Sequence, residues 1–307
     1  MPGVPRTVAV DVGGTNLRLA LIEGADHFLD RTDLPTPASL ADVPDAIITA
    51  ASGMDAEAVG VGVAGLVRHD EGVVSWMPHR PGTGVAVGTR VAEAMGVPVV
   101  VDNDANMACL AEARMGSGRG HRAVLLITVG TGIGASLALG GSVERGRGHL
   151  GEVGHVVLDP GGPECRCGLR GCWEAMASGT ALDRAARLLA AADPRGALAA
   201  ACAGRTPSGV DLVAAARAGD ADAAAAVHEV GSWLGRGLGA MIGVFDPDVL
   251  VVGGTVGLLD EVLDPARAAM MGSIPGAAHR RPTPVERGAL GGDAGLIGAA
   301  LAAGGAT

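Results

Sequence analysis

Two segments of this sequence repeat one pattern, in which an apolar strand, a glycine turn and a second apolar strand follow each other. The first segment covers residues 7–23 with the turn GGTN at 13–16, and the second covers 123–139 with the turn GTGIG at 130–134. Strand pairs of this kind, set among strands that alternate with helices, are typical of layered α/β folds. We therefore expect two α/β domains, each containing one copy of the unit.

The remaining apolar runs support the same fold class. Strands are expected at 27–35, 58–63, 98–103 and 248–254, and helices near 41–52, 85–96, 104–115, 258–272 and from Asp293 onward, with an alanine-rich helical region at 178–245. The glycine-rich stretch 116–121 marks a change in composition and is predicted to be a linker. The strand pair at 123–139 then begins the second domain.

Lysine is absent from the 307 residues, so all 23 basic side chains are arginine, and 33 acids bring the formal net charge to −10. This absence excludes a Walker A lysine, a Schiff-base lysine and the strand lysine of protein kinases. The acidic balance, with only 3 Trp, 2 Phe and no Tyr, argues against a nucleic-acid-binding protein.

The sequence predicts neither secretion nor membrane insertion. No charged segment followed by an apolar stretch precedes Asp11, so a signal peptide is not expected. Residues 123–143 carry no charge, but their glycines, threonines and β-branched residues fit two buried strands better than a membrane helix. We expect a cytoplasmic protein that binds neither membrane nor nucleic acid.

Three glycine turns are candidate nucleotide-binding elements, because backbone N–H groups without nearby Cβ atoms can approach phosphate oxygens. Any one of them alone is weak evidence in a glycine-rich chain, and the alternative is a plain hairpin turn. Asp11, at the end of a predicted buried strand, is a candidate to hold Mg²⁺ through water. The candidate residues are Gly13, Gly14, Thr15 and Asn16, then Gly130, Thr131, Gly132 and Gly134, and finally Gly253 and Gly254.

A cluster of cysteines predicts a metal site. Cys165, Cys167 and Cys172 are three thiols within eight positions, and His155 is the nearest upstream imidazole, with His149 as a competing fourth ligand. Three thiolates and one imidazole satisfy tetrahedral zinc and leave no position for water, so the zinc is expected to be structural. A disulfide between any two of the cysteines would leave the third unpaired.

Acidic side chains are placed where they can bind a polyol. The run Asp102-Asn103-Asp104-Ala105-Asn106 ends a predicted strand and begins a helix, and capping explains one acid there better than two. Phosphoryl transfer to an alcohol requires a carboxylate near the attacking hydroxyl. Glu152 and Glu174 flank the cysteine cluster, so a zinc-held loop would fix two carboxylates that can accept from sugar hydroxyls.

Together these motifs resemble the ROK family of sugar kinases and sugar-responsive repressors, within the actin-like ATPase superfamily. The resemblance spans nearly the whole chain, and its most specific part is GEVGH with CRCGLRGCWE; glucokinases of actinobacteria are the members most similar to it. The other motifs are DVGGTN at 11–16, DNDAN at 102–106, GTGIG at 130–134 and VVGG at 251–254. The resemblance implies the actin-like (ribonuclease H-like) fold, with two α/β domains and a cleft between them.

The same resemblance implies ATP-dependent phosphorylation of the 6-hydroxyl of a hexose, glucose being favoured, with Mg²⁺ and structural zinc. Asp104 matches the catalytic base, and the first and second glycine turns match phosphate loops, while the third matches the adenosine side. The implied hexose contacts are Gly65, Asn103, Asp104, Glu152, His155 and Glu174, and His155 is also implied as a zinc ligand. Members are typically homodimers or homotetramers, with a small domain (1–115, rejoined by a helix at 293–307) and a large zinc-bearing domain (116–292).

Two positions depart from the family pattern. Asn16 stands where many relatives have lysine, and Met77-Pro78-His79-Arg80 stands where relatives have Pro-Asn followed by tryptophan. The second departure borders the implied sugar site, so a kinase of an amino or N-acetylated hexose remains an alternative, and polyphosphate an alternative donor. A sugar-sensing repressor is the alternative from another class, but only ten residues precede Asp11, too few for the DNA-binding segment of such repressors.

Overall fold

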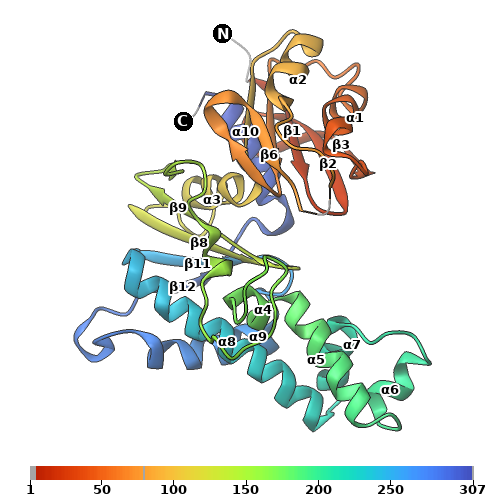
Figure 1. Ribbon diagram of the computed structural model, residues 1–307. Coiled ribbons are helices and arrows are strands. Elements are labelled where there is room, and N and C mark those ends of the chain that lie inside the picture. Colours follow the sequence, from red (N-terminus) through yellow and green to blue (C-terminus); the bar gives the residue numbers. More distant parts are fainter. Residues whose placement is uncertain (1–4, 79, 306–307) are drawn as a thin grey trace. The chain divides into compact units, whose positions relative to one another are not determined.

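Two five-stranded sheets organise the part of the chain that the computed structural model describes, residues 5–78 and 80–305 (Figure 1). Contacts between residues divide the chain into two compact units. The first comprises the chain up to Leu126, Ser136–Leu150 and the chain from Ala289 onward; the second comprises Ile127–Ala135 and Gly151–Gly288. The last helix therefore belongs to the same unit as the N-terminal residues.

The sheet of the first unit has the strand order β3-β2-β1-β4-β7. Its strands are β1 (Arg6–Val12), β2 (Asn16–Glu23), β3 (His27–Pro35), β4 (Ala58–Val63) and β7 (Val99–Asn103). β4 runs parallel to β1 and to β7, with Val12 beside Val63 and Val63 beside Asn103. The carboxyl ends of these three strands therefore lie at one edge of the sheet, where ligands bind in open α/β sheets.

β4 reads Ala-Val-Gly-Val-Gly-Val because its two faces are covered differently. Its valines belong to a buried core with α1 (Val43–Ala50) and α2 (Val87–Met95). On the other face, a Cβ at Gly60 would lie 2.0 Å from the carbonyl oxygen of Ala299. Since side chains alternate between the faces of a strand, the glycines mark the side on which helices approach the backbone.

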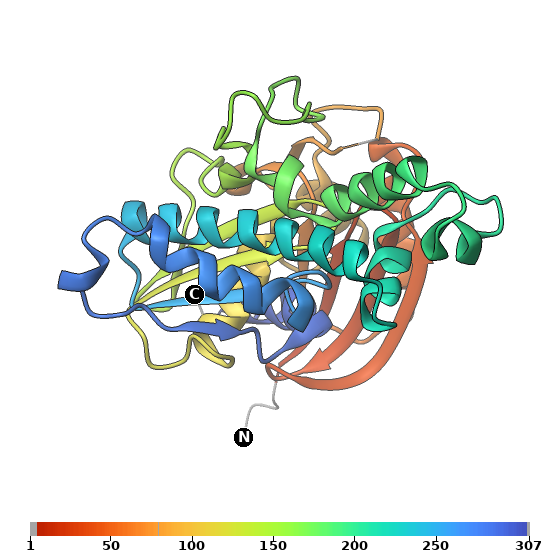
Figure 2. The ribbon, with the colours of Figure 1, turned by 90° about the horizontal axis from the view of Figure 1, so that it is seen from below.

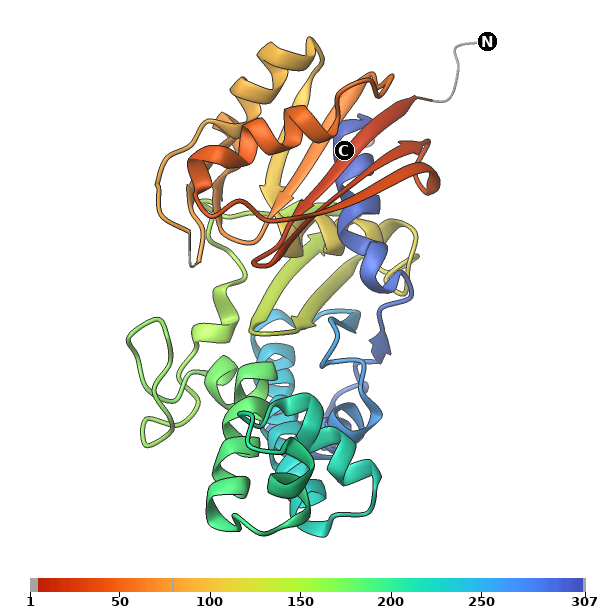
Figure 3. The same ribbon diagram turned by 90° about the vertical axis from the view of Figure 1, so that its right-hand side faces the viewer.

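The helices on that glycine side are α3 (Asp104–Arg114) and α10 (Ala294–Ala303), which pack against each other and against β4. Figure 3 shows α10, in blue, next to the first sheet. A Cβ at Gly298 would lie 1.7 Å from the carbonyl oxygen of Met107, so only glycine permits this approach of the two helices. α3 carries the acidic motif at its first residue and is thus held against the core of the sheet.

The second sheet has the strand order β10-β9-β8-β11-β12. Its strands are β8 (Ala123–Val129), β9 (Ile133–Leu139), β10 (Ser142–Glu144), β11 (Val249–Gly253) and β12 (Val285–Arg287). β8 and β9 are the predicted second copy of the strand–turn–strand unit. The two copies, β1–β2 and β8–β9, thus lie in different sheets. The division into two units nevertheless passes through the second copy, because Ile127–Ala135 belongs to the second unit and the rest of β8 and β9 to the first.

The second unit also contains a helical layer in which α8 and α9 lie side by side (Figure 2). Its helices are α4 (Trp173–Ala177), α5 (Gly179–Ala192), α6 (Ala197–Cys202), α7 (Gly209–Arg217), α8 (Ala221–Phe245) and α9 (Asp260–Met270). Gly231, Gly235 and Gly239 of α8 are spaced by four residues. A Cβ at any of them would lie 2.6 Å or less from a carbonyl oxygen of α9. This row of glycines explains how the alanine-rich helices pack so closely.

Short elements complete the fold. A hairpin of β5 (Leu66–Arg68) and β6 (Val73–Trp76) follows β4; it was not predicted, because both strands are short. Single-turn helices lie at Leu40–Asp42, His69–Glu71, Glu152–His155, Met271–Ser273, Ala277–His279 and Gly291–Asp293. No helix among the described residues is long and apolar enough to cross a membrane.

Two local predictions need correction. The stretch 116–121, predicted as a linker, is a turn within the first unit, where the buried Glu112 carboxylate accepts from the N–H of Ser117 at 2.9 Å. The same carboxylate accepts from the N–H of Leu290 at 2.9 Å. Asp293 precedes α10 as expected, but its side chain makes no capping hydrogen bond and instead pairs with Arg31 at 2.8 Å.

Candidate active site

Asn103 joins the acidic motif to the chain after β4. It is the N-cap of α3, and its Oδ1 accepts from the backbone N–H of Ala105 at 2.9 Å and of Asn106 at 3.3 Å. Its Nδ2 donates to the carbonyl oxygen of Gly65 at 3.1 Å. Asn103 and Gly65, both predicted hexose contacts, are therefore neighbours at the carboxyl edge of the first sheet.

Gly65 is held in place by the backbone of the β5–β6 hairpin. A Cβ at this position would lie 2.3 Å from the carbonyl oxygen of Trp76, so no residue with a side chain fits without moving the strand. The chain after β4 consequently turns closely along the hairpin and presents its backbone next to Asn103.

Asp102 is buried and its oxygens are used within the protein. The residue is 3% exposed, and its Oδ1 accepts from Asn106 Nδ2 at 2.8 Å while its Oδ2 accepts from Arg145 Nε at 2.8 Å. Ser136 continues the network by donating to Asn106 Oδ1 at 2.7 Å, and His69 Nδ1 lies 3.6 Å from Asp102 Oδ2. A buried carboxylate with several donors is a structural group, because it has lost access to a substrate.

Asp104, in contrast, is only half-buried. It is the first residue of α3, where the partial positive charge of the helix favours an acid. The motif thus divides its two acids: Asp102 faces Arg145 inside the unit, and Asp104 keeps access to solvent. Both acids are visible in the sequence, but the sequence did not predict that Asp102 pairs with Arg145.

The first glycine turn connects β1 to β2 and is held through its carbonyl groups. The Thr36 hydroxyl donates to the Gly13 carbonyl at 2.7 Å, Arg80 Nη2 donates to the Gly14 carbonyl at 2.7 Å, and the Thr36 N–H donates to the Thr15 carbonyl at 2.9 Å. In a trans peptide the C=O of one residue points opposite to the N–H of the next. The N–H groups of Gly14 and Thr15 therefore point away from Thr36 and Arg80, on a turn whose residues Gly14–Asn16 are exposed.

Asp11, the candidate Mg²⁺ acid, lies on β1 directly opposite Arg18 of β2. Its Oδ2 accepts from Arg18 Nη2, and its side chain is 13% exposed. Arg18 also donates to the Gly292 carbonyl at 2.7 Å, which ties the ion pair to the segment before α10. The carboxylate is thus oriented at the carboxyl end of β1, but it shares its charge with an arginine.

The second glycine turn, between β8 and β9, is held by the start of α5. The Gly179 N–H donates to the Gly130 carbonyl at 2.8 Å, and the Thr180 N–H and hydroxyl donate to the Thr131 carbonyl at 3.2 and 2.8 Å. By the same peptide geometry, the N–H groups of Thr131 and Gly132 point away from α5. Gly134, the last candidate of this turn, is the second residue of β9.

The third glycine turn packs directly on the second. A Cβ at Gly254 would lie 2.4 Å from the carbonyl oxygen of Val129, which also accepts from the N–H of Val256 at 2.9 Å. Gly253 is the last residue of β11, beside β8 in the sheet. The following helix begins only at Asp260, so the turn itself lies beside Val129 rather than a helix N-terminus.

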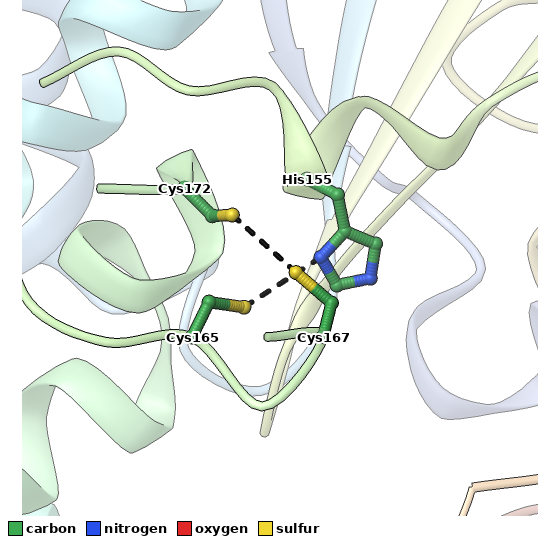
Figure 4. Close-up of side chains that lie close together, drawn as sticks. All are labelled: His155, Cys165, Cys167 and Cys172. Atoms are coloured by element: carbon green, nitrogen blue, oxygen red, sulfur yellow. Dashed lines mark hydrogen bonds between the residues drawn. The ribbon is translucent and has the colours of Figure 1, made fainter. Parts of the chain in front are cut away.

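The four predicted metal ligands converge, as Figure 4 shows. The ligand atoms of His155, Cys165, Cys167 and Cys172 all lie within 4.8 Å of one another, and the five cysteines of the chain form no disulfide. Cys165 Sγ lies 3.7 Å from His155 Nδ1, and Cys167 Sγ lies 3.6 Å from Cys172 Sγ. A tetrahedron with zinc–sulfur bonds of about 2.3 Å has edges of about 3.8 Å, so the donor set fits structural zinc. The fourth donor is His155 and not His149.

The thiols differ in how easily they ionise. Burial raises the pKa of Cys172 to about 12 and also raises the pKa of Cys165. Although desolvation opposes ionisation of Cys167, hydrogen bonds from the backbone N–H of Leu169 and from the other two thiols lower its pKa. Cys167 is exposed, whereas Cys172 is fully buried. Binding of a metal ion must therefore displace protons from the buried thiols.

The predicted hexose contacts of the second unit surround this metal site. His155 turns Nδ1 toward the thiols, and its Nε2 lies 3.9 Å from Glu152 Oε2, so the imidazole and this carboxylate are neighbours without a hydrogen bond between them. Glu174 follows Cys172 by two residues and lies in the first turn of α4. Its Oε2 accepts from the N–H of Ile133 at 2.9 Å, next to the second glycine turn.

The sequence profile of the ROK family matches residues 7–305. The chain belongs to the ROK family. The glucokinase of Streptomyces coelicolor is 38% identical to it over 96% of each chain. The N-acetylmannosamine kinase of Escherichia coli O139:H28 is 34% identical, and the alignment covers 97% of this chain and 98% of that protein.

Among solved ROK structures, the glucokinase of Streptomyces griseus in complex with glucose and AMPPNP superposes with a TM-score of 0.86. It is 38% identical to this chain, with 97% of this chain and 99% of that chain covered. The agreement confirms the fold class inferred from the motifs, because ROK sugar kinases have the actin-like ATPase fold. It also confirms the resemblance to glucokinases of actinobacteria.

Three residues that hold the candidate site were not predicted from the sequence, and one predicted residue is not described by the structure. His79, the departure in the loop bordering the predicted sugar site, lies outside the described residues. Arg145, Thr36 and Thr180 were not predicted, because each acts on a backbone or carboxylate far away in the sequence. Of the three, only Arg145 could have been suspected from the sequence, because it is an arginine shortly before the GEVGH motif.

Proposed function

We propose that this ROK protein is a glucokinase, which transfers the γ-phosphoryl group of ATP to the 6-hydroxyl of glucose. The observation that carries the proposal is the division of the two acids at the start of α3. Asp102 is 3% exposed and bonded to Arg145, whereas Asp104 is half-buried at the carboxyl edge of the sheet. The greater exposure of Asp104 supports its proposed role as the acceptor of the proton from a substrate hydroxyl.

In the proposed reaction Asp104 is the general base. Its carboxylate accepts the proton of the 6-hydroxyl while that oxygen attacks the γ-phosphorus. The new bond joins the sugar oxygen to phosphorus, and the bond from the γ-phosphorus to the bridging oxygen breaks, so that ADP leaves. Gly65, Asn103, Glu152, His155 and Glu174 are the proposed contacts that orient the hexose.

The glycine turns are proposed to bind the phosphates through their N–H groups. Their carbonyls are engaged by Thr36 and Arg80 in the first turn and by Gly179 and Thr180 in the second, which supports this role. Gly253 and Gly254 are proposed to lie on the adenosine side. A lysine-free chain then neutralises phosphate charge with backbone amides and Mg²⁺, for which Asp11 is the proposed ligand through water.

Substitution of the base tests the proposal. We expect Asp104→Asn to lower kcat with glucose about 1,000-fold, since general-base catalysis contributes roughly 10²- to 10⁴-fold. Asp222→Asn is the matched control, because Asp222 is an exposed acid in the first turn of α8. ADP release in a coupled assay is the measurement, and a folded Asp104→Asn protein with normal turnover would contradict the proposal.

A second candidate substrate is an N-acetylated or amino hexose. The 34% identity to an N-acetylmannosamine kinase favours it, since that relative covers the chain as fully as the glucokinases do. Comparison of kcat/KM for glucose, mannose, N-acetylmannosamine and glucosamine, with ATP and with polyphosphate, decides between the candidates. We further propose a cytoplasmic homodimer or homotetramer, because ATP is a cytoplasmic substrate and ROK members commonly assemble in this way.

A further inference from the structure

Glu174 makes a contact that the hexose role does not require. Its Oε2 accepts from the backbone N–H of Ile133 at 2.9 Å, and Ile133 is the first residue after the turn that contains Gly130, Thr131 and Gly132. Hydrogen bonds to an ionised acceptor are stronger than neutral ones. The carboxylate therefore fixes the end of a proposed phosphate loop.

Two glycines near this contact allow the turn and the metal-bearing segment to pack closely. A Cβ at Gly132 would lie 2.1 Å from Glu174 Oε2, so the carboxylate occupies the space where a side chain would otherwise project. A Cβ at Gly154 would lie 2.4 Å from the carbonyl oxygen of Ile133. Both glycines are thus explained by packing between the turn and the metal-bearing segment, and not only by the approach of phosphate.

The helix that carries Glu174 is itself held in place next to the predicted metal site. Glu174 lies in α4, a helix that begins after the metal ligand Cys172 and contains the fully buried Trp173. Trp173 donates its backbone N–H to the Val156 carbonyl at 2.9 Å and its Nε1 to the Trp233 carbonyl at 3.1 Å. The helix that carries the carboxylate is therefore anchored on both sides, which lets Glu174 act on the turn as a rigid support.

We propose that Glu174 is a positioning residue for the second glycine turn. A carboxylate can accept several hydrogen bonds, so Oε2 holds Ile133 while Oε1 accepts from a hexose hydroxyl. One side chain then serves the hexose and the geometry of the nucleotide loop together. The inference rests on the proposed function for its substrates, but the contact with Ile133 is independent of them.

Two variants separate the hydrogen bond to Ile133 from the proposed contact with the hexose. Glu174→Ala removes the acceptor, whereas Glu174→Gln keeps an oxygen for Ile133 and changes the charge offered to the hexose. We expect the exchange of the Ile133 amide hydrogen in the ligand-free protein to be at least about tenfold faster in Glu174→Ala, which corresponds to about 1.4 kcal/mol. In Glu174→Gln it stays within about threefold of the wild type, since the neutral hydrogen bond remains.

Nucleotide affinity is the second readout. Without hexose, we expect the Kd of AMPPNP to rise about tenfold in Glu174→Ala and to stay within about threefold in Glu174→Gln, while the KM of glucose rises in both. Glu229→Ala is the matched control, because Glu229 is exposed on α8 in the same unit. It is expected to leave all three quantities unchanged.

Unchanged protection of Ile133 in Glu174→Ala would overturn the positioning role. Lost protection with an unchanged AMPPNP Kd would equally overturn it, because the turn would then not depend on the carboxylate for nucleotide binding. A wild-type protein that binds no AMPPNP contradicts the proposed kinase function instead, and the exchange rate of Ile133 still decides whether Glu174 holds the turn.

Discussion

The two glycine turns of this protein have the same local design and different supports. In each turn the N–H of the first glycine donates within the turn, from Gly13 to the Asn16 carbonyl and from Gly130 to the Gly132 carbonyl. The other carbonyl groups accept hydrogen bonds from donors elsewhere in the chain, and the N–H groups that follow them point the other way. Thr36 and Arg80 supply the donors for the first turn, and Gly179 and Thr180 supply them for the second. Repetition in sequence therefore corresponds to repetition of the exposed amides.

The difference lies in what stands behind each turn. The first is supported by Arg80 and by the hydroxyl and backbone N–H of Thr36, and Gly14 has open space where a Cβ would project. The second is supported by Glu174 and by a segment that carries the Cys₃His metal site. A glycine turn thus acquires its rigidity from remote residues, and two turns with similar sequences are expected to respond differently to the same perturbation.

Loss of a metal ligand is expected to have the largest effect and to separate the turns. Cys172→Ala should reduce bound zinc from about one per chain to a small fraction, since structural zinc contributes folding energy directly. We expect amide hydrogen exchange in the second turn to become at least about tenfold faster, while the first turn is unchanged. Metal analysis and exchange mass spectrometry measure both.

Cys202→Ala is the control for this experiment, because Cys202 is a buried cysteine of the same unit outside the metal group. It should retain zinc and the protection of both turns. Equal loss of protection in the two turns of Cys172→Ala would show that the metal site stabilises the whole chain and that the contrast between the turns is wrong.

The pH dependence of metal binding gives the next test. Burial raises the pKa of Cys172 to about 12 and raises the pKa of Cys165, so both thiols keep their protons at neutral pH when no metal is bound. Metal binding releases these protons, and the affinity should therefore fall on acidification, by up to about tenfold per pH unit for each displaced proton. Chelator competition between about pH 6 and pH 8 measures the slope; a flat profile would contradict the protonated state.

Matched alanine substitutions in the turns should differ in stability by about 1–3 kcal/mol. Gly132→Ala places a methyl group where Glu174 Oε2 lies, so the carboxylate must leave Ile133. Gly14→Ala meets no atom within 4 Å, and its free energy of unfolding should stay within about 0.5 kcal/mol of the wild type. Urea unfolding of the two variants measures the difference; similar losses in both would show that the supports are equivalent.

Removal of a hydroxyl donor should give the smallest loss of stability. Here the first turn should lose more than the second, the reverse of the glycine substitutions. Thr36→Val deprives the Gly13 carbonyl of a buried donor and should cost about 1 kcal/mol. Thr180→Val should cost less than about 0.5 kcal/mol, because the Thr180 N–H still donates to the Thr131 carbonyl. Thermal unfolding compares the pair, and a larger loss for Thr180→Val would mean that its backbone bond does not compensate.

Much of the fold could be predicted from local pattern. The apolar runs of β1, β2 and β4 and the helix start at Asp104 were predicted within one or two residues, since period and capping residues determine them. The β5–β6 hairpin could not be predicted, because its strands are three and four residues long and depend on the neighbouring backbone. The stretch 116–121 was misjudged because its order comes from the distant carboxylate of Glu112.

The sequence by itself determined the two strand–turn–strand units, the family and the three cysteine ligands, because residue type and short spacing suffice for each of them. The tertiary structure decided between His155 and His149 as the fourth ligand. Only the tertiary structure decided that Asp102 pairs with Arg145, 43 residues away, and that Glu174 holds Ile133, 41 residues away. These contacts depend on where the chain returns in space. Burial therefore distinguishes Asp102, which is 3% exposed, from the half-buried Asp104, although in the sequence both are aspartates two residues apart.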